Sequence, residues 1–155
     1  MRDYGKAVSL LKGLLKSFVY AFNGIKNAVL TERNFRIHMT AIFFVLYFSV
    51  LYGLTPTQYA VLYLILAAVP ALELVNTAVE KAVDLATDKR CELAKIAKDS
   101  AAAAVLVAAF GALGVAISLF SDTEKFKFAL STALSLPHLP ILVITAIFWI
   151  YFIFF

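Results

Sequence analysis

The stretch QYAVLYLILAAVPALELVNTAVEKAVD, residues 58–84, combines a long apolar run with the most unusual polar residues of this chain. Residues 58–79 predict a helix long enough to cross a hydrocarbon layer about 30 Å thick. Four polar residues follow one another at helical steps of three, four and four, so they share one face: Glu73, Asn76, Glu80 and Asp84. Ionisable groups at membrane depth are costly unless they are paired or functional, so this polar stripe indicates a site.

The composition indicates an all-α integral membrane protein. Of 155 residues, 63% are hydrophobic and 15% are charged, whereas a soluble domain is nearer half apolar. The single cysteine, Cys91, excludes an internal disulfide and a multi-cysteine metal site, and is expected to be a free cytoplasmic thiol.

The apolar runs predict three core transmembrane helices, at about 36–53, 58–79 and 100–120. Pro70 lies inside the second and is expected to kink it just before Glu73. Alanines and glycines dominate much of the third, which permits close helix packing.

Two further segments flank this core. Residues 4–30 are amphipathic and lysine-rich, which predicts a surface helix in the membrane interface. After a polar linker at 121–136, the apolar tail 139–155 would reach roughly 25 Å as a helix, slightly short of the hydrocarbon core. We predict that the tail is a fourth span, with an interfacial segment as the alternative. The expected domains are therefore 1–120, embedded in the membrane, and 121–155, a linker with an extra helix.

The distribution of basic residues predicts the orientation. Of fourteen lysines and arginines, seven lie in residues 1–36 and five in 81–98, which leaves Lys125 and Lys127. The positive-inside rule places both basic segments in the cytoplasm and the linker outside. Topology thus explains the net charge of +4 without nucleic acid as a partner.

Acidic residues gather at the predicted cytoplasmic edge, a pattern that suits phosphoryl transfer. Two carboxylates can hold Mg²⁺ against phosphate oxygens, and a lysine such as Lys98 can neutralise phosphate charge. Glu73 is the most deeply placed acid and the best candidate for the base that deprotonates a lipid hydroxyl. The phosphate loop and the catalytic motifs of soluble kinases are missing from the sequence.

Other interpretations of these residues remain open. The stripe could be a structural polar network, or it could line the pathway of a small oligomeric channel or ion-binding protein. Glu32 could cap a helix, and Lys98 with Asp99 could be an ordinary pair at a helix start. Asp84 could be a surface charge or a partner of Lys81 or Lys89.

The segments ELVNTAVEKAVDLAT (73–87) and AKIAKDSAAAAVLVAA (94–109) resemble the prokaryotic diacylglycerol kinase family, which also contains undecaprenol kinases. TERNFRIH (31–38) and YAFNGIKNA (20–28) match as well, so the resemblance covers about residues 4–120. It implies a homotrimer in the bacterial cytoplasmic membrane, with the N-terminus and the active sites on the cytoplasmic side, between subunits.

The resemblance also implies roles for matched residues. Glu73 would be the catalytic base, and Glu32 and Glu80 would bind Mg²⁺ with the phosphates of ATP. Tyr20, Lys98 and Asp99 would contact the nucleotide, and the adenosine end is expected near residues 88–90. Asn76 would shape the site, and Arg36 and Glu73 would lie near the lipid.

The form RNFRIH, with His38, resembles the undecaprenol kinase branch. Undecaprenol is therefore the expected lipid substrate, and diacylglycerol, which would give phosphatidic acid, is the alternative. Arg90 and Cys91 stand where the family often has a Tyr-His pair, so the adenine contacts are left open.

Overall fold

The computed structural model describes residues 2–87 and 91–155, with side chains from residue 9 onward. Within these ranges the chain forms helices and no strand, which confirms the all-α prediction. The helices are α1 (Arg2–Thr31), α2 (Arg33–Tyr52), α3 (Pro56–Ala86), α4 (Glu92–Leu119), α5 (Thr123–Ala133) and α6 (Leu139–Phe154). By length and composition, α2, α3 and α4 can each cross a membrane.

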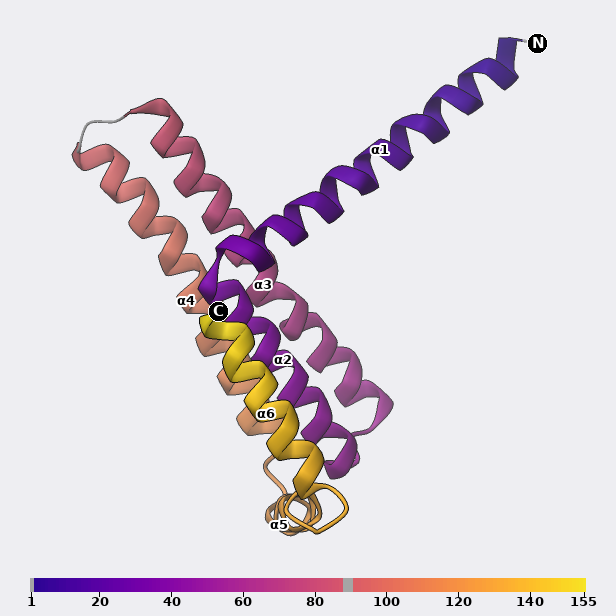
Figure 1. Cartoon of the computed structure of the whole chain (residues 1–155), viewed down its shortest axis with the longest axis vertical. Coiled ribbons are helices and arrows are strands. Elements are labelled where there is room, and N and C mark those ends of the chain that lie inside the picture. Colours follow the sequence, from indigo (N-terminus) through magenta and orange to yellow (C-terminus); the bar gives the residue numbers. More distant parts are fainter. Residues whose placement is uncertain (1, 88–90) are drawn as a thin grey trace. The chain divides into compact units, whose positions relative to one another are not determined.

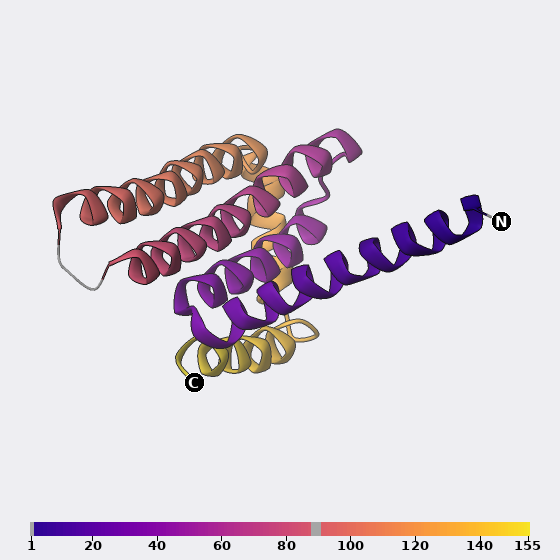
Figure 2. The ribbon, with the colours of Figure 1, turned by 90° about the horizontal axis from the view of Figure 1, so that it is seen from above.

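The chain divides into two compact units, Met1–Glu32 and Arg33–Phe155, and each is described by itself. The first unit is α1, whose large apolar side chains are exposed, among them Leu11, Phe18 and Phe22. This is the amphipathic helix that the sequence predicts. The second unit contains α2 to α6, shown from two directions in Figures 1 and 2.

A short reversal makes α2 and α3 antiparallel. Gly53 has φ +73°, a left-handed conformation that glycine adopts readily, and its N–H donates to the Ser49 carbonyl at 3.1 Å. Thr55 then caps α3 in a capping box, in which its own N–H donates to the Gln58 side chain at 2.8 Å. Pro56 occupies the first turn of α3, where its missing N–H costs nothing.

Helices α3 and α4 extend beyond the predicted spans and lie side by side (Figures 1 and 2). α3 continues through Pro70 and through the charged residues 80–86, and α4 begins at Glu92 instead of near residue 100. Most of the basic segment 81–98 is therefore helical, because its alanines, leucines and lysines are good helix formers. At 31 residues α3 is about 46 Å long, more than a hydrocarbon core needs.

The predicted linker at 121–136 contains a helix, α5, which packs against α2. Asp122 caps it by accepting from the N–H groups of Glu124 and Lys125, at 3.1 Å each. Ala129 is fully buried in a cluster that includes Tyr52. The helix was missed because its buried positions are small alanines, which give a weak apolar period.

Helix α6 lies along α2 in the antiparallel direction (Figure 1). The Tyr47 hydroxyl lies 3.2 Å from Nδ1 of His138 at the start of α6, and the rings of Phe43 and Trp149 are 5.3 Å apart. With 16 residues, α6 is shorter than the three helices that are long enough to cross a membrane, so the fourth-span interpretation of the tail stays a prediction.

We predict that Ala129→Leu lowers the free energy of unfolding by about 1–3 kcal/mol, because a larger side chain must overpack a fully buried position. Thermal unfolding in detergent measures the effect. Ser131→Leu adds comparable bulk at an exposed position of the same helix and is the control. Equal stability of the two variants would contradict the packing of α5.

Candidate active site

The polar stripe on α3 is graded by depth. Glu73 is 4% exposed and Asn76 is 7% exposed, although both are polar. Glu80 is half-buried and Asp84 is exposed, one turn farther along the same face. The order is the one that the sequence predicts, with Glu73 deepest.

Glu73 and Asn76 line a partly open cleft of about 300 Å³ in which three helices meet. This volume is at the lower end of the range for small-molecule sites. The other lining residues are Asn34, Ile37 and His38 from α2, and Ala102, Val105, Leu106 and Ala109 from α4. The sequence interpretation missed Asn34 and Ile37. Their spacing with His38, at positions i, i+3 and i+4 near the start of α2, is typical of one helix face.

Asn76 carries an unsatisfied buried acceptor. Its Nδ2 donates to Oε1 of Glu80 at 3.0 Å, the contact between positions i and i+4 that helical spacing predicts. Its Oδ1 is buried and has no hydrogen-bond partner among the described residues. Since buried polar atoms are usually paired, the cleft is suited to a ligand that presents an O–H or N–H donor.

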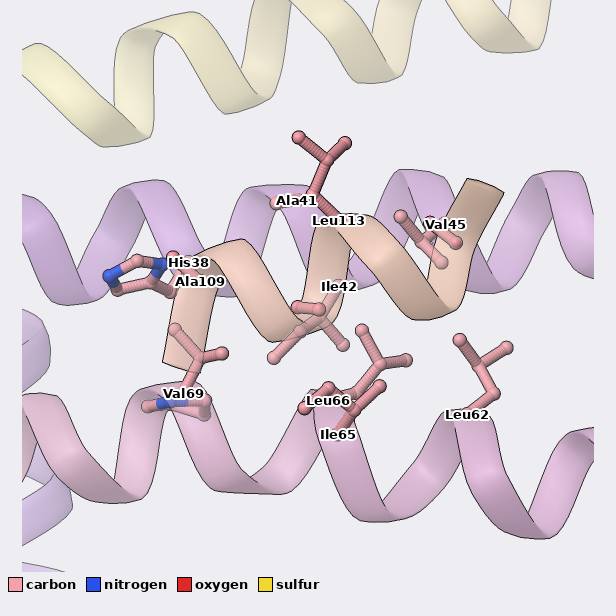
Figure 3. Close-up of a pocket in the computed structure, with 13 residues that line it drawn as sticks. His38, Ala41, Ile42, Val45, Leu62, Ile65, Leu66, Val69, Ala109 and Leu113 are labelled. Atoms are coloured by element: carbon pink, nitrogen blue, oxygen red, sulfur yellow. The ribbon is translucent and has the colours of Figure 1, made fainter. Parts of the chain in front are cut away.

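A second, apolar cavity of about 290 Å³ adjoins the cleft (Figure 3). The two share His38 and Ala109 as lining residues. In Figure 3 the labelled side chains of α2 and α3 face one another across this cavity, and His38 is the polar group among them. The remaining lining residues are Ala41, Ile42, Val45, Leu62, Ile65, Leu66, Val69, Pro70, Ala112, Leu113 and Ala116. A polar cleft that adjoins an apolar cavity suits an amphiphilic ligand.

Two exposed ion pairs lie beyond the cleft. Lys98 pairs with Asp84 and so joins α4 to α3, and Lys95 pairs with Asp99 at 2.8 Å. The hydrogen bond that Lys95 donates to Asp99, and then the negative charge of Asp99, raise the pKa of Lys95. Exposed pairs of this kind contribute little to stability, so either pair can be broken at small cost.

Arg36 lies away from the cleft. Its Nε and Nη2 donate to the carbonyl oxygen of Ile153 in α6, at 3.3 and 3.1 Å. The predicted contact between Arg36 and the lipid therefore stays a prediction, and in this chain the guanidinium binds α6.

Of the remaining predicted residues, Glu32 and Tyr20 belong to the first unit. Glu32 accepts a hydrogen bond from Oγ1 of Thr31 at 2.9 Å, and Tyr20 is exposed. Residues 88–90, predicted near the adenosine end, lie outside the described residues. Cys91 is exposed and precedes α4.

The stripe offers only oxygen ligands and an amide, which is the donor chemistry that Mg²⁺ prefers. No three His, Cys, Asp or Glu side chains converge in the described part of the chain. Because Mg²⁺ commonly takes one or two carboxylates together with substrate phosphates, Glu80 fits as one such ligand.

A family model described as prokaryotic diacylglycerol kinase matches residues 19–120. The chain belongs to this family of lipid kinases. An undecaprenol kinase of Bacillus subtilis is 45% identical over 97 residues, which cover 63% of this chain and 79% of that protein. A diacylglycerol kinase of Synechocystis sp. is 48% identical over 101 residues, which cover 64% of this chain and 58% of that protein. No solved structure matches the chain.

The family match ends near the end of α4, so α5 and α6 lie outside it. Every residue that lines the cleft lies inside it. The cleft is thus part of the lipid kinase portion of the chain, whereas α5 and α6 are additions to that portion.

We predict that Asn76→Leu leaves the free energy of unfolding within about 1 kcal/mol of the parent. The change loses one hydrogen bond to Glu80 but also removes a buried acceptor without a partner, and these effects offset each other. Leu62→Ala, at a fully buried apolar position, is the contrasting variant and should lose about 2–5 kcal/mol. A comparable loss in both variants, measured by thermal unfolding, would mean that Asn76 holds the helices together.

Proposed function

We propose that this protein transfers the γ-phosphate of ATP to the hydroxyl group of a membrane lipid, preferentially undecaprenol. The observation that carries the proposal is the deeply buried carboxylate of Glu73 in a cleft that adjoins an apolar cavity. Family membership supports the reaction class.

In the proposed reaction, the lipid chain enters the apolar cavity and its hydroxyl lies in the cleft beside Glu73. The Glu73 carboxylate takes the hydroxyl proton while the lipid oxygen forms a bond to the γ-phosphorus, and the bond to the ADP oxygen breaks. The products are ADP and a lipid phosphate. Before the transfer, the hydroxyl can donate its one proton to Oδ1 of Asn76, and it then turns that proton to the Glu73 carboxylate.

The nucleotide is proposed to bind on the water side of Glu73. Glu80 and Glu32 would hold Mg²⁺ with the phosphates, and Mg²⁺ would supply charge neutralisation when bound. Lys98, Asp99 and Tyr20 would contact ATP. The hydrogen bond from Asn76 fixes one oxygen of Glu80.

The lining of the apolar cavity supports a lipid alcohol without ester groups. The apolar cavity is lined by hydrocarbon apart from His38, so it offers few partners for the ester groups of diacylglycerol. The two named relatives differ in substrate at nearly equal identity, so they do not choose between undecaprenol and diacylglycerol.

The proposed location is the bacterial cytoplasmic membrane, with the N-terminus and the site in the cytoplasm, as the positive-inside rule predicts. The proposed assembly is a homotrimer with sites between subunits. Exposed apolar side chains along α4, such as Val107 and Phe110, can face lipid or a second copy.

The substrate is tested with the purified protein in detergent, labelled ATP and Mg²⁺, with undecaprenol or diacylglycerol. We expect label in the lipid fraction, with the higher kcat/KM for undecaprenol. A higher kcat/KM for diacylglycerol would show that diacylglycerol, and not undecaprenol, is the preferred substrate. An unlabelled lipid fraction in both reactions would contradict the kinase proposal.

We predict that Glu73→Gln lowers kcat by at least about a hundredfold, because the amide cannot take the proton of the hydroxyl. ATP binding, measured by fluorescence with a nucleotide analogue, should be nearly unchanged. Glu124→Gln makes the same chemical change at an exposed position of α5 and should leave turnover unchanged. Loss of ATP binding in Glu73→Gln would mean that Glu73 holds the nucleotide instead.

A further inference from the structure

Helix α6 is bound to α2 at both of its ends. Near its start, His138 lies within hydrogen-bond distance of the Tyr47 hydroxyl, at 3.2 Å. Near its end, the carbonyl oxygen of Ile153 accepts two hydrogen bonds from the guanidinium of Arg36. The helix therefore follows α2 back toward the end that carries the cleft.

α6 covers the face of α2 that is opposite the cavities. At 100° per residue, Arg36, Phe43 and Tyr47 fall on one face of α2, and His38 and Ile42 fall on the other. The first group contacts α6 and the second lines the apolar cavity. In Figure 3 the pale yellow helix passes on the far side of α2 from the labelled residues of α3.

The contact between Arg36 and Ile153 satisfies a specific need of each partner. The last four carbonyls of a helix have no partner within it, and Ile153 lies in the last turn of α6, which ends at Phe154. A cation at a helix C-terminus also interacts favourably with the helix dipole. α6 itself carries no charged side chain, so the cation that meets its last turn comes from α2.

Arg36 lies in the same two turns of α2 as Asn34, Ile37 and His38, which line the cleft. A guanidinium held by α6 on one side of these turns limits how far they can rotate or shift in depth. The cleft wall on the other side is thereby held in place.

We propose that the last turn of α6 is a positioning element. Through the Ile153 carbonyl it holds Arg36, and through Arg36 it holds the cleft-lining turns of α2 in the arrangement that binds the lipid alcohol. The proposal rests on the proposed kinase function. α6 lies outside the matched family region, so this element is an addition to the catalytic portion.

Two shortened chains form a matched test. A chain that ends at Ile153 keeps an acceptor beside Arg36, because its terminal carboxylate replaces the carbonyl. A chain that ends at Trp149 keeps the ring contact with Phe43 but lacks the Ile153 carbonyl. Its own end lies about 6 Å short of that position along the helix. We expect the second chain to raise KM for undecaprenol about tenfold, with KM for ATP unchanged, and the first to behave as the full chain. Equal lipid KM in both shortened chains would overturn the proposal.

Arg36→Gln, made in the full chain and in the chain that ends at Trp149, tests whether α6 acts through Arg36. If it does, Arg36→Gln raises lipid KM in the full chain, and the shortening then adds nothing further. Effects that multiply would show that α6 and Arg36 act independently, which contradicts the proposal. Arg36→Lys keeps the charge but not the paired N–H donors, so it should recover only part of the affinity.

A readout without turnover separates this proposal from the kinase proposal. A thiol placed by Ile37→Cys in a Cys91→Ser background reports on the cleft wall through its rate of labelling by a small maleimide. We expect faster labelling in the chain that ends at Trp149 than in the chain that ends at Ile153, even in a preparation that phosphorylates no lipid. If the shorter chain does not fold, full-length Arg36→Gln takes its place in this comparison. Equal labelling rates would remove the positioning role, whereas an inactive full chain with unequal rates would remove only the kinase function.

Discussion

The cost of burying a carboxylate and an amide between apolar helices is the constraint on which the rest of this structure depends. Glu73 and Asn76 lie within a helix that can cross a membrane, and both are more than nine-tenths buried. In hydrocarbon such groups are tolerated where they face a cavity or other protein groups. α2 and α4 supply that protection, since both contribute walls to the cleft around the two residues. The helices outside the family match then act on α2, which is the element that closes the cleft from one side.

α2 is in contact with other elements of the second unit on several of its faces. One of its faces lines the polar cleft and the apolar cavity, and the opposite face is covered by α6. Its far end packs with α5 through Tyr52, whose hydroxyl accepts a hydrogen bond from the Asp122 N–H at 3.0 Å. A helix held on so many sides can keep a fixed register against α3, and the geometry of the cleft depends on that register.

The sequence was most informative where helical spacing alone decides the outcome. The stripe on α3 lies in the predicted order of depth, and the contact of Asn76 with Glu80 follows directly from their separation. The spans were predicted to within a few residues at their apolar ends, because hydropathy changes sharply there. Their charged ends were predicted too short, since charge marks the edge of the membrane and not the end of a helix.

The features that the sequence did not predict depend on small side chains with little hydrophobic period or on contacts between residues far apart in the chain. α5 is buried through alanines, which leave little periodic signal. The acceptor of Arg36 is a backbone carbonyl 117 residues away, and a carbonyl has no signature in a sequence. The sequence shows that Arg36 can donate hydrogen bonds, but it does not show that its guanidinium points toward α6.

The length of α3 and α4 has a consequence for how substrates would enter the proposed site and products would leave it. Both helices carry their charged residues well past the thickness of a hydrocarbon layer, so their connected ends stand in water. The apolar cavity, by contrast, is lined by residues from the apolar parts of α2, α3 and α4. A nucleotide would then arrive and depart along the membrane normal, while the lipid and its phosphorylated form move sideways in the leaflet. Under the proposed function the two routes would not compete, so neither substrate would have to wait for the other to clear the same entrance.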